Sequence, residues 1–103
     1  MDKYKIIVSK SVYSMLGGHV KFLSQVNAAA GKKLKIRIME AIRSLESMPK
    51  RHPFFEAEHI PPNKYRKLFV ENWYLILYQI KGNTVNVDYV VDCRKDYGWL
   101  LKG

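Results

Sequence analysis

The sequence predicts an α+β fold in which a small antiparallel or mixed sheet packs against a helical hairpin. Two observations lead to this prediction. Apolar residues recur with helical spacing between residues 12 and 48, and three β-rich segments follow one another between residues 64 and 92. A short β-prone run at residues 4–8 comes before them. The expected order is β-α-α-β-β-β in one domain of residues 1–103, with the face away from the helices partly open for a site.

The first helix is predicted from a 3.6-residue apolar period. Ser9 or Ser11 can cap its start, because a hydroxyl oxygen accepts an otherwise unpaired backbone N–H. Gly17 and Gly18 weaken its interior by roughly 1 kcal/mol each relative to alanine, so a break there is one alternative. Gly31 is the expected end of the helix. The residues that carry the period are Val12, Met15, Leu16, Phe22, Leu23, Val26 and Ala30.

The second helix and the loop after it are separated by Pro49. Residues 32–48 repeat the helical period, and a proline ends such a pattern. Two amphipathic helices joined by a short turn predict an antiparallel hairpin. Residues 51–63 hold three of the four prolines and predict a loop with a short extended piece at residues 54–55.

The three strands are expected at residues 64–70, 73–80 and 85–91. Asn72 marks the first turn between them, and the Gly82–Asn83 pair marks the second. Connections as short as these require antiparallel neighbours. Residues 97–101 are expected to form a terminal helical turn.

Charge is the strongest compositional signal. The 103 residues carry 18 Lys and Arg against nine Asp and Glu, a formal charge of +9. Such a field attracts RNA, DNA, an anionic membrane surface or an acidic protein, and charge alone does not choose among them. Cys93 is the single cysteine, which fits a reducing compartment. Apolar runs are too short for a signal peptide or a membrane span, so we expect a soluble cytoplasmic protein without a membrane partner.

Five segments in this order resemble the RelE/ParE family of type II toxin–antitoxin toxins, which includes plasmid stabilization system toxins. The resemblance implies a two-helix, small-sheet fold and a cognate antitoxin whose tail wraps the toxin. Family members either cleave mRNA in the ribosomal decoding site without a metal or poison DNA gyrase. The segments are Lys3-Tyr4-Lys5-Ile6, Ile42-Arg43-Ser44-Leu45-(x)3-Pro49, Tyr65-Arg66-Lys67-Leu68, Tyr74-Leu75-Ile76-Leu77-Tyr78 and Val90-Val91-Asp92-Cys93-Arg94-Lys95-Asp96-Tyr97.

Two arginines are the main catalytic candidates. Metal-free RNA cleavage needs a group that stabilises charge on the phosphate, and the arginine fork can bind two phosphate oxygens. Arg66 matches the basic residue of the family's Tyr-Arg strand motif, and Arg94 matches a basic residue beyond the last strand. We expect both guanidinium groups to converge on the uncovered face of the sheet. The alternative is that each is a surface arginine or is bound to the sheet end.

The resemblance to the ribosome-dependent nucleases is incomplete. Leu68 and Leu75 stand where those nucleases often carry basic residues, and Asp92 stands about where some carry a histidine. Asp92 is a weak base, because its unperturbed pKa is about 4. Its alternative role is to anchor Arg94 or Lys95 in an ion pair.

The remaining candidates are contacts to nucleic acid. Tyr97, a catalytic candidate, and Trp99 are placed to stack on bases, and for Trp99 closure of the core is the stronger alternative. The histidines and the cysteine show no metal-ligand spacing, so neither a metal nor a cofactor is expected. The expected nucleic-acid contacts are Lys64, Lys67, Lys95 and Trp99.

Three functions share this expected fold. The first is a toxin that inhibits translation by ribosome-dependent mRNA cleavage, an mRNA interferase whose partners are its antitoxin and the ribosome with its mRNA. The second is a ParE-like gyrase poison without nuclease chemistry, which explains the missing basic residues. The third is a nucleic-acid-binding domain or an inactive toxin relic. The sequence leaves open whether the chain is an enzyme.

Overall fold

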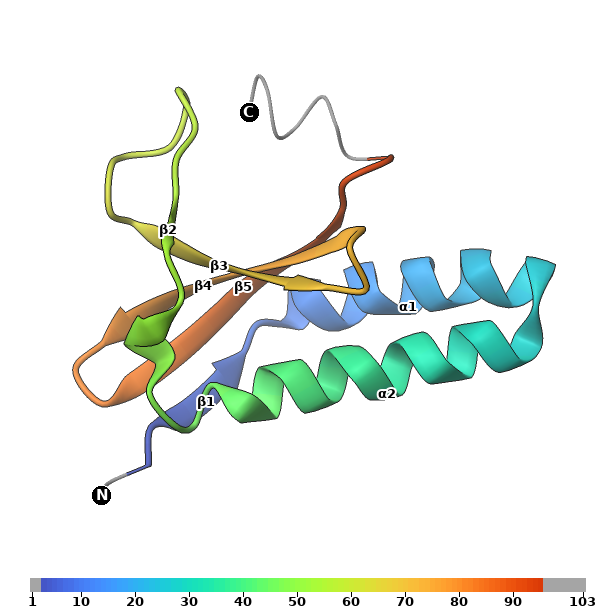
Figure 1. The fold of residues 1–103 in the computed structure, drawn as a ribbon, viewed down its shortest axis with the longest axis horizontal. Coiled ribbons are helices and arrows are strands. Elements are labelled where there is room, and N and C mark those ends of the chain that lie inside the picture. The colour runs from blue at the N-terminus through green and yellow to red at the C-terminus, as the bar shows by residue number, and fades with distance from the viewer. Residues whose placement is uncertain (1–2, 96–103) are drawn as a thin grey trace.

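A computed structural model describes residues 3–95 and confirms the predicted α+β fold. A five-stranded sheet of order β1-β5-β4-β3-β2 is covered on one face by two helices (Figure 1). The expected terminal turn at residues 97–101 lies outside the described residues. The elements are β1 (Lys5–Val8), α1 (Lys10–Val26), α2 (Ala28–Ser44), the short 3₁₀ helix η1 (Pro49–Arg51), β2 (Phe54–Phe55), β3 (Tyr65–Val70), β4 (Tyr74–Lys81) and β5 (Thr84–Asp92).

The sheet is mixed. From β2 to β5, each strand pairs antiparallel with the next one along the chain. The other edge of β5 pairs in parallel with β1. The pairing of β4 with β5 contains a bulge: Leu77 lies opposite Tyr89, but Tyr78 lies opposite Val87. The extra residue of β5 shifts the register of everything beyond it by one position. Tyr74 near the end of the ladder therefore pairs with Asp92.

The two helices meet at Asn27, not at the predicted glycine. Asn27 ends α1 and caps α2, where its side-chain oxygen accepts the N–H of Ala30 at 3.1 Å. Gly31 lies inside α2 and is buried, so the expectation that it stops the first helix is wrong. A Cβ at this position would sit 3.0 Å from the carbonyl oxygen of Val20. The glycine is needed because the helices approach closely here.

The helix ends differ in detail from the sequence prediction. Ser9 is the N-cap of α1, but its hydroxyl makes no cap hydrogen bond and instead lies 3.0 Å from the Ser11 hydroxyl. α1 continues through Gly17 and Gly18, which are both exposed, so no break occurs there. α2 ends at Ser44, four residues earlier than predicted.

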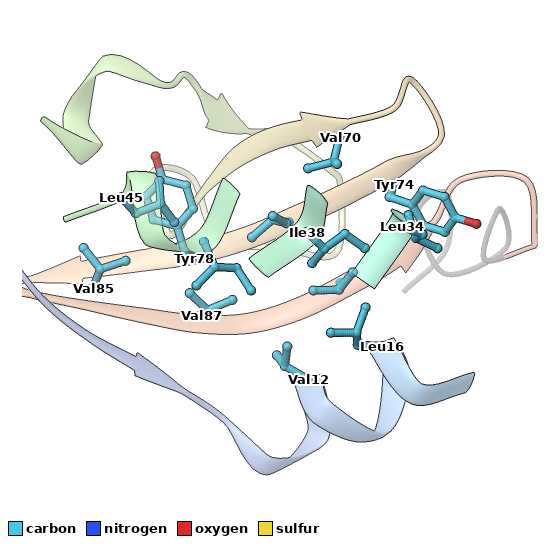
Figure 2. Close-up of a cluster of buried hydrophobic side chains, with 13 residues drawn as sticks. Val12, Leu16, Leu34, Ile38, Leu45, Val70, Tyr74, Tyr78, Val85 and Val87 are labelled. Carbon is cyan, nitrogen blue, oxygen red and sulfur yellow. The ribbon is translucent and has the colours of Figure 1, made fainter. Parts of the chain in front are cut away.

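The main core lies between the helices and the sheet (Figure 2). Alternate residues of β4 point into it, and the residues between them point to the opposite face. On that opposite face a second, smaller cluster forms, against which Ala57 and Ile60 of the loop after β2 pack. The face that was expected to be open is therefore partly covered. The second cluster contains Phe55, Tyr65, Leu75, Leu77 and Val91.

Candidate functional site

The candidate site is built around Arg94, just beyond β5. Its backbone N–H and its Nε–H donate to Asp92 Oδ1 at 2.9 and 3.2 Å, and its Nη2 donates to Oδ2 at 3.2 Å. The same Nη2 donates to the Tyr74 hydroxyl at 3.1 Å. The guanidinium lies 5.2 Å from the centre of the Trp73 ring. Charge-assisted bonds to both carboxylate oxygens fix the orientation of the arginine.

Asp92 anchors Arg94. Its side chain is only 1% exposed, whereas that of Arg94 is 45% exposed. Burial acts to raise the pKa of Asp92, but the hydrogen bonds and the charge of Arg94 outweigh burial and hold that pKa below its ordinary value. Hydrogen bonding to Asp92 in turn raises the pKa of Arg94. Both groups are charged at neutral pH, and Asp92 is a still weaker base than its residue type suggests.

Tyr74 and His19 complete this cluster from two other elements. Burial raises the pKa of Tyr74, so its hydroxyl stays protonated at neutral pH. His19 on α1 has its Nε2 2.9 Å from the carbonyl oxygen of Val90, and a carbonyl can only accept, so the ring donates there. The His19 and Tyr74 rings lie 5.5 Å apart. Neither residue stands out in the sequence as part of a site, because the bulge in β5 sets Tyr74 opposite Asp92 and the packing of α1 brings His19 to Val90.

A hollow of about 390 Å³ lies beside this cluster, between the helical hairpin and the β3–β4 turn. This volume falls in the range of small-ligand sites. Lys33 and Arg94 bring positive charge to it, and Trp73 brings a ring that is 51% exposed. Glu71 at the rim pairs with Arg37 at 3.5 Å. The hollow therefore presents a fixed arginine, a lysine and an aromatic surface.

Arg66 has a different set of contacts. Its Nη1 donates to the carbonyl oxygens of Lys50 at 3.1 Å and His52 at 2.7 Å. Its guanidinium stacks 4.0 Å from the centre of the Phe54 ring. Burial, followed by the charges of Arg51 and Arg66, lowers the pKa of His52. Arg66 thus fastens the segment that follows α2 to the start of β3.

The two arginines do not meet. Arg66 pairs across the sheet with Tyr78, and Arg94 bonds to Tyr74. These tyrosines are four residues apart on β4, which is about 13 Å along a strand. Figure 2 shows them at opposite ends of the main core, and both point toward the helices. The expectation that the two guanidinium groups converge on the uncovered face is therefore wrong.

The predicted lysine contacts are scattered. Lys64 Nζ lies 5.4 Å from the centre of the Tyr65 ring, near the Arg66 end. Lys95 Nζ lies 3.9 Å from the centre of the Phe22 ring, near Arg94. Lys67 is half-buried, and strand alternation directs its side chain to the face away from the helices. These lysines do not form one binding surface.

Leu68 and Leu75 limit the chemistry that the site supports. Leu68 packs against the main core, and Leu75, 1% exposed, lies in the second cluster. Leu68 is partly buried and Leu75 is buried, so both positions where the resemblance led us to look for basic residues are apolar. Tyr97 and Trp99 lie outside the described residues.

Within residues 3–95, no group of three or more His, Cys, Asp or Glu side chains is placed to hold a metal ion. No helix in this range is long and apolar enough to cross a membrane.

The fold has a counterpart among solved structures. The chain matches one from "Chromosomal ParDE TA system from P. aeruginosa" with a TM-score of 0.71 and 14% sequence identity, covering 87% of this chain and 96% of that one. No protein-family model matches the sequence, and no curated protein matches it either. At this identity the likeness concerns the arrangement of helices and strands. The predicted RelE/ParE toxin-like fold is confirmed at that level.

Proposed function

We propose that the chain is the toxin component of a type II toxin–antitoxin pair. The structural counterpart belongs to a chromosomal ParDE TA system, and 96% of that chain is matched. The five segments that resemble the RelE/ParE family support the same function, as does the charge of +9. A basic toxin suits an antitoxin with an acidic tail.

We infer further that the toxin acts by binding its target, as a gyrase poison, and not by cutting mRNA. The observation that carries this inference is the separation of the two arginines. Arg66 Nη1 donates to two backbone carbonyl oxygens, and Asp92 binds Arg94 at the other end of the sheet. During RNA cleavage the phosphate is transferred from one oxygen to another. Donors that stabilise its developing charge must lie within about 3 Å of it. One phosphate cannot contact both arginines in this arrangement.

The acid–base requirements of cleavage point the same way. Asp92 is buried and its pKa is lowered, so it is a poor acceptor for the proton of a ribose hydroxyl. Leu68 and Leu75 offer neither charge nor a proton. Among residues 3–95, Arg94 is the candidate that combines a fixed guanidinium with access to solvent. Such a group serves recognition as well as it serves catalysis.

The hollow beside Arg94 is the proposed target-binding surface. Arginine and tryptophan are the residue types that most often dominate binding energy at protein interfaces. Here Arg94 is pre-oriented by Asp92, and Trp73 projects beside it. A pre-oriented side chain loses little entropy on binding, which favours affinity. The surface suits an acidic patch on a protein partner.

Three measurements test this function. Expressed alone from an inducible promoter, the chain should arrest bacterial growth, and co-expression of its antitoxin should restore it. Purified chain should inhibit supercoiling by DNA gyrase. Mapping of mRNA 5′ ends after induction should show no new codon-phased cuts. Codon-phased cuts without gyrase inhibition would replace the binding mechanism by nuclease action, and normal growth would remove the toxin function altogether.

A matched pair of variants locates the surface. Trp73→Ala removes an aromatic ring that is 51% exposed beside Arg94, and Phe69→Ala removes one that is 53% exposed at the preceding strand. We expect Trp73→Ala to weaken gyrase inhibition at least tenfold and Phe69→Ala to leave it within twofold. Equal effects of the two variants would show that target binding does not use the Arg94 hollow.

A further inference from the structure

η1 and the β4–β5 turn lie at the end of the molecule opposite the end of β5 (Figure 1). Two adjoining hollows are lined by residues of these two segments and of their surroundings. Their volumes are about 480 and 300 Å³. No carboxylate of the described chain lines either hollow. We call this surface the basic end. The basic residues that line it are Lys3, Lys50, Arg51, Lys64 and Arg66, and Lys50 lines both hollows.

The basic end differs from the other hollows in charge balance. The hollow beside Arg94 includes Glu71, and a hollow on the exposed side of α2 includes Glu40. At the basic end the neighbouring carboxylate is that of Glu46, which lies 3.8 Å from Lys3 Nζ in an exposed pair. Exposed pairs of this kind are weak and are screened by salt. The positive charge of the basic end is therefore largely uncompensated.

The backbone of η1 is fixed from inside the domain. The Tyr78 hydroxyl donates to the carbonyl oxygen of Pro49 at 2.6 Å, and Arg66 donates to those of Lys50 and His52. The carbonyl oxygens are the negative ends of the peptide dipoles, and here they already have donors. An anion that approaches η1 from solvent meets the Lys50 side chain, while the carbonyl oxygens of Pro49 and Lys50 already have donors.

The turn before η1 is held in the same way. Arg51 Nη1 donates to the carbonyl oxygens of Ser47 and Met48. Met48 has a left-handed backbone, with φ of 49°, and its side chain is 61% exposed. A left-handed residue other than glycine is costly and persists where its surroundings fix it. The backbone of residues 47–52 at the basic end is thus preorganised, and preorganisation lowers the entropy lost on binding.

From these observations we propose that the basic end is a binding site for single-stranded nucleic acid. Five basic side chains around two hollows that share Lys50 suit consecutive phosphates. Tyr4 lines the first hollow and Phe54, stacked with Arg66, lines the second. Aromatic and guanidinium planes in a basic groove are the features on which unpaired bases stack. A duplex keeps its bases inside and would not use them.

This site is separate from the Arg94 hollow, and its test does not require toxicity or gyrase inhibition. Fluorescence anisotropy would measure binding of the purified chain to labelled 12-nucleotide oligouridylate and oligothymidylate, with a duplex 12-mer and a 12-residue polyglutamate as comparisons. We expect both single strands to bind more tightly than the duplex and the peptide. Three phosphate contacts would make the logarithm of the affinity fall with a slope of about −2 against the logarithm of salt concentration.

A charge-matched pair of double variants locates the binding. Lys50→Ala with Lys64→Ala removes two basic side chains from the basic end, and Lys32→Ala with Lys35→Ala removes two from the exposed side of α2. The first pair should lower single-strand affinity about tenfold and reduce the salt slope by about 1. The second pair should leave affinity within twofold.

Three results would overturn the proposal. Equal losses in both double variants would mean that binding follows net charge. Equal or tighter binding of the duplex would remove the role of unpaired bases. Polyglutamate binding that is equally tight and equally sensitive to Lys50 and Lys64 would identify an acidic protein segment as the occupant.

Discussion

Arg66 and Arg94 lie on the same side of the same sheet, and comparison of their surroundings separates two roles. Arg94 faces a buried carboxylate, so its charge is balanced and its position is fixed. Arg66 faces neutral carbonyl oxygens, so it orders a turn and leaves its charge uncompensated. The same residue type thus gives an oriented recognition group at one end and a positively charged surface at the other. The acceptor opposite an arginine determines which role it takes.

The largest expected effect is that of Arg94→Ala. The substitution removes the guanidinium from the buried Asp92 carboxylate, which keeps its hydrogen bond from the backbone N–H of residue 94, and we expect the free energy of unfolding to fall by about 2 kcal/mol. Urea denaturation monitored by tryptophan fluorescence measures this loss. Arg94→Lys keeps the charge without the fork and should lose less. A smaller loss for Arg94→Ala than for Arg66→Ala would contradict the comparison.

The pH dependence of stability measures how much the ionised form of Asp92 contributes to the unfolding free energy. This contribution is part of the loss expected in Arg94→Ala. The pKa of Asp92 in the folded chain lies below its ordinary value. Its ionised form therefore stabilises the fold above the unfolded pKa of about 3.9, and this contribution is lost as pH falls through the folded pKa. The wild type should exceed Asp92→Asn in unfolding free energy at pH 6, and the gap should shrink below pH 4. A gap that is constant from pH 6 to pH 2 would show that the carboxylate charge does not contribute.

Arg66→Ala should have a smaller effect. It removes two hydrogen bonds to neutral carbonyl oxygens that lie near solvent, so water can replace the guanidinium. We expect a loss of about 1 kcal/mol in the same denaturation experiment. Backbone amide exchange should accelerate at residues 50–52 and not near Arg94. Unchanged exchange there would show that Arg66 does not order the turn.

The smallest expected effect is the coupling between the two arginines. Sites more than about 7–10 Å apart without shared partners give additive changes, within about 0.5 kcal/mol. The double variant Arg66→Ala, Arg94→Ala should therefore lose the sum of the single losses. A coupling energy above about 1 kcal/mol would show that the two ends of the sheet act as one site.

Much of the fold followed from local patterns. Helical spacing of apolar residues predicted α1 and α2, and the succession of β-rich segments and turns predicted β3, β4 and β5. The helix junction did not follow, because the cap at Asn27 and the packing role of Gly31 depend on how the helices approach each other. Local signals do not report that contact.

The site was harder to predict than the fold. Strand pairing counted outward from the Gly82–Asn83 turn would place Tyr74 opposite Val91. The bulge in β5 moves Tyr74 opposite Asp92 instead, and so joins Asp92, Arg94 and Tyr74 in one cluster. No residue type in the sequence marks that bulge. Arg66 was recognised as a motif residue, but its carbonyl partners belong to a segment whose path only the tertiary structure fixes.

The parallel pairing of β1 with β5 has a consequence for biosynthesis. Ile6 pairs with Val85, about eighty residues later in the chain. When the ribosome releases β1, its hydrogen-bonding partner has not yet been made, and such distant contacts slow folding. The helical hairpin and the β2–β3–β4 part of the sheet can form early, but β1 can join the sheet only after β5 has been made. A nascent molecule therefore lacks the strand that joins β1 to β4 and the Arg94 cluster that follows it, and its first opportunity to act comes only after translation of β5.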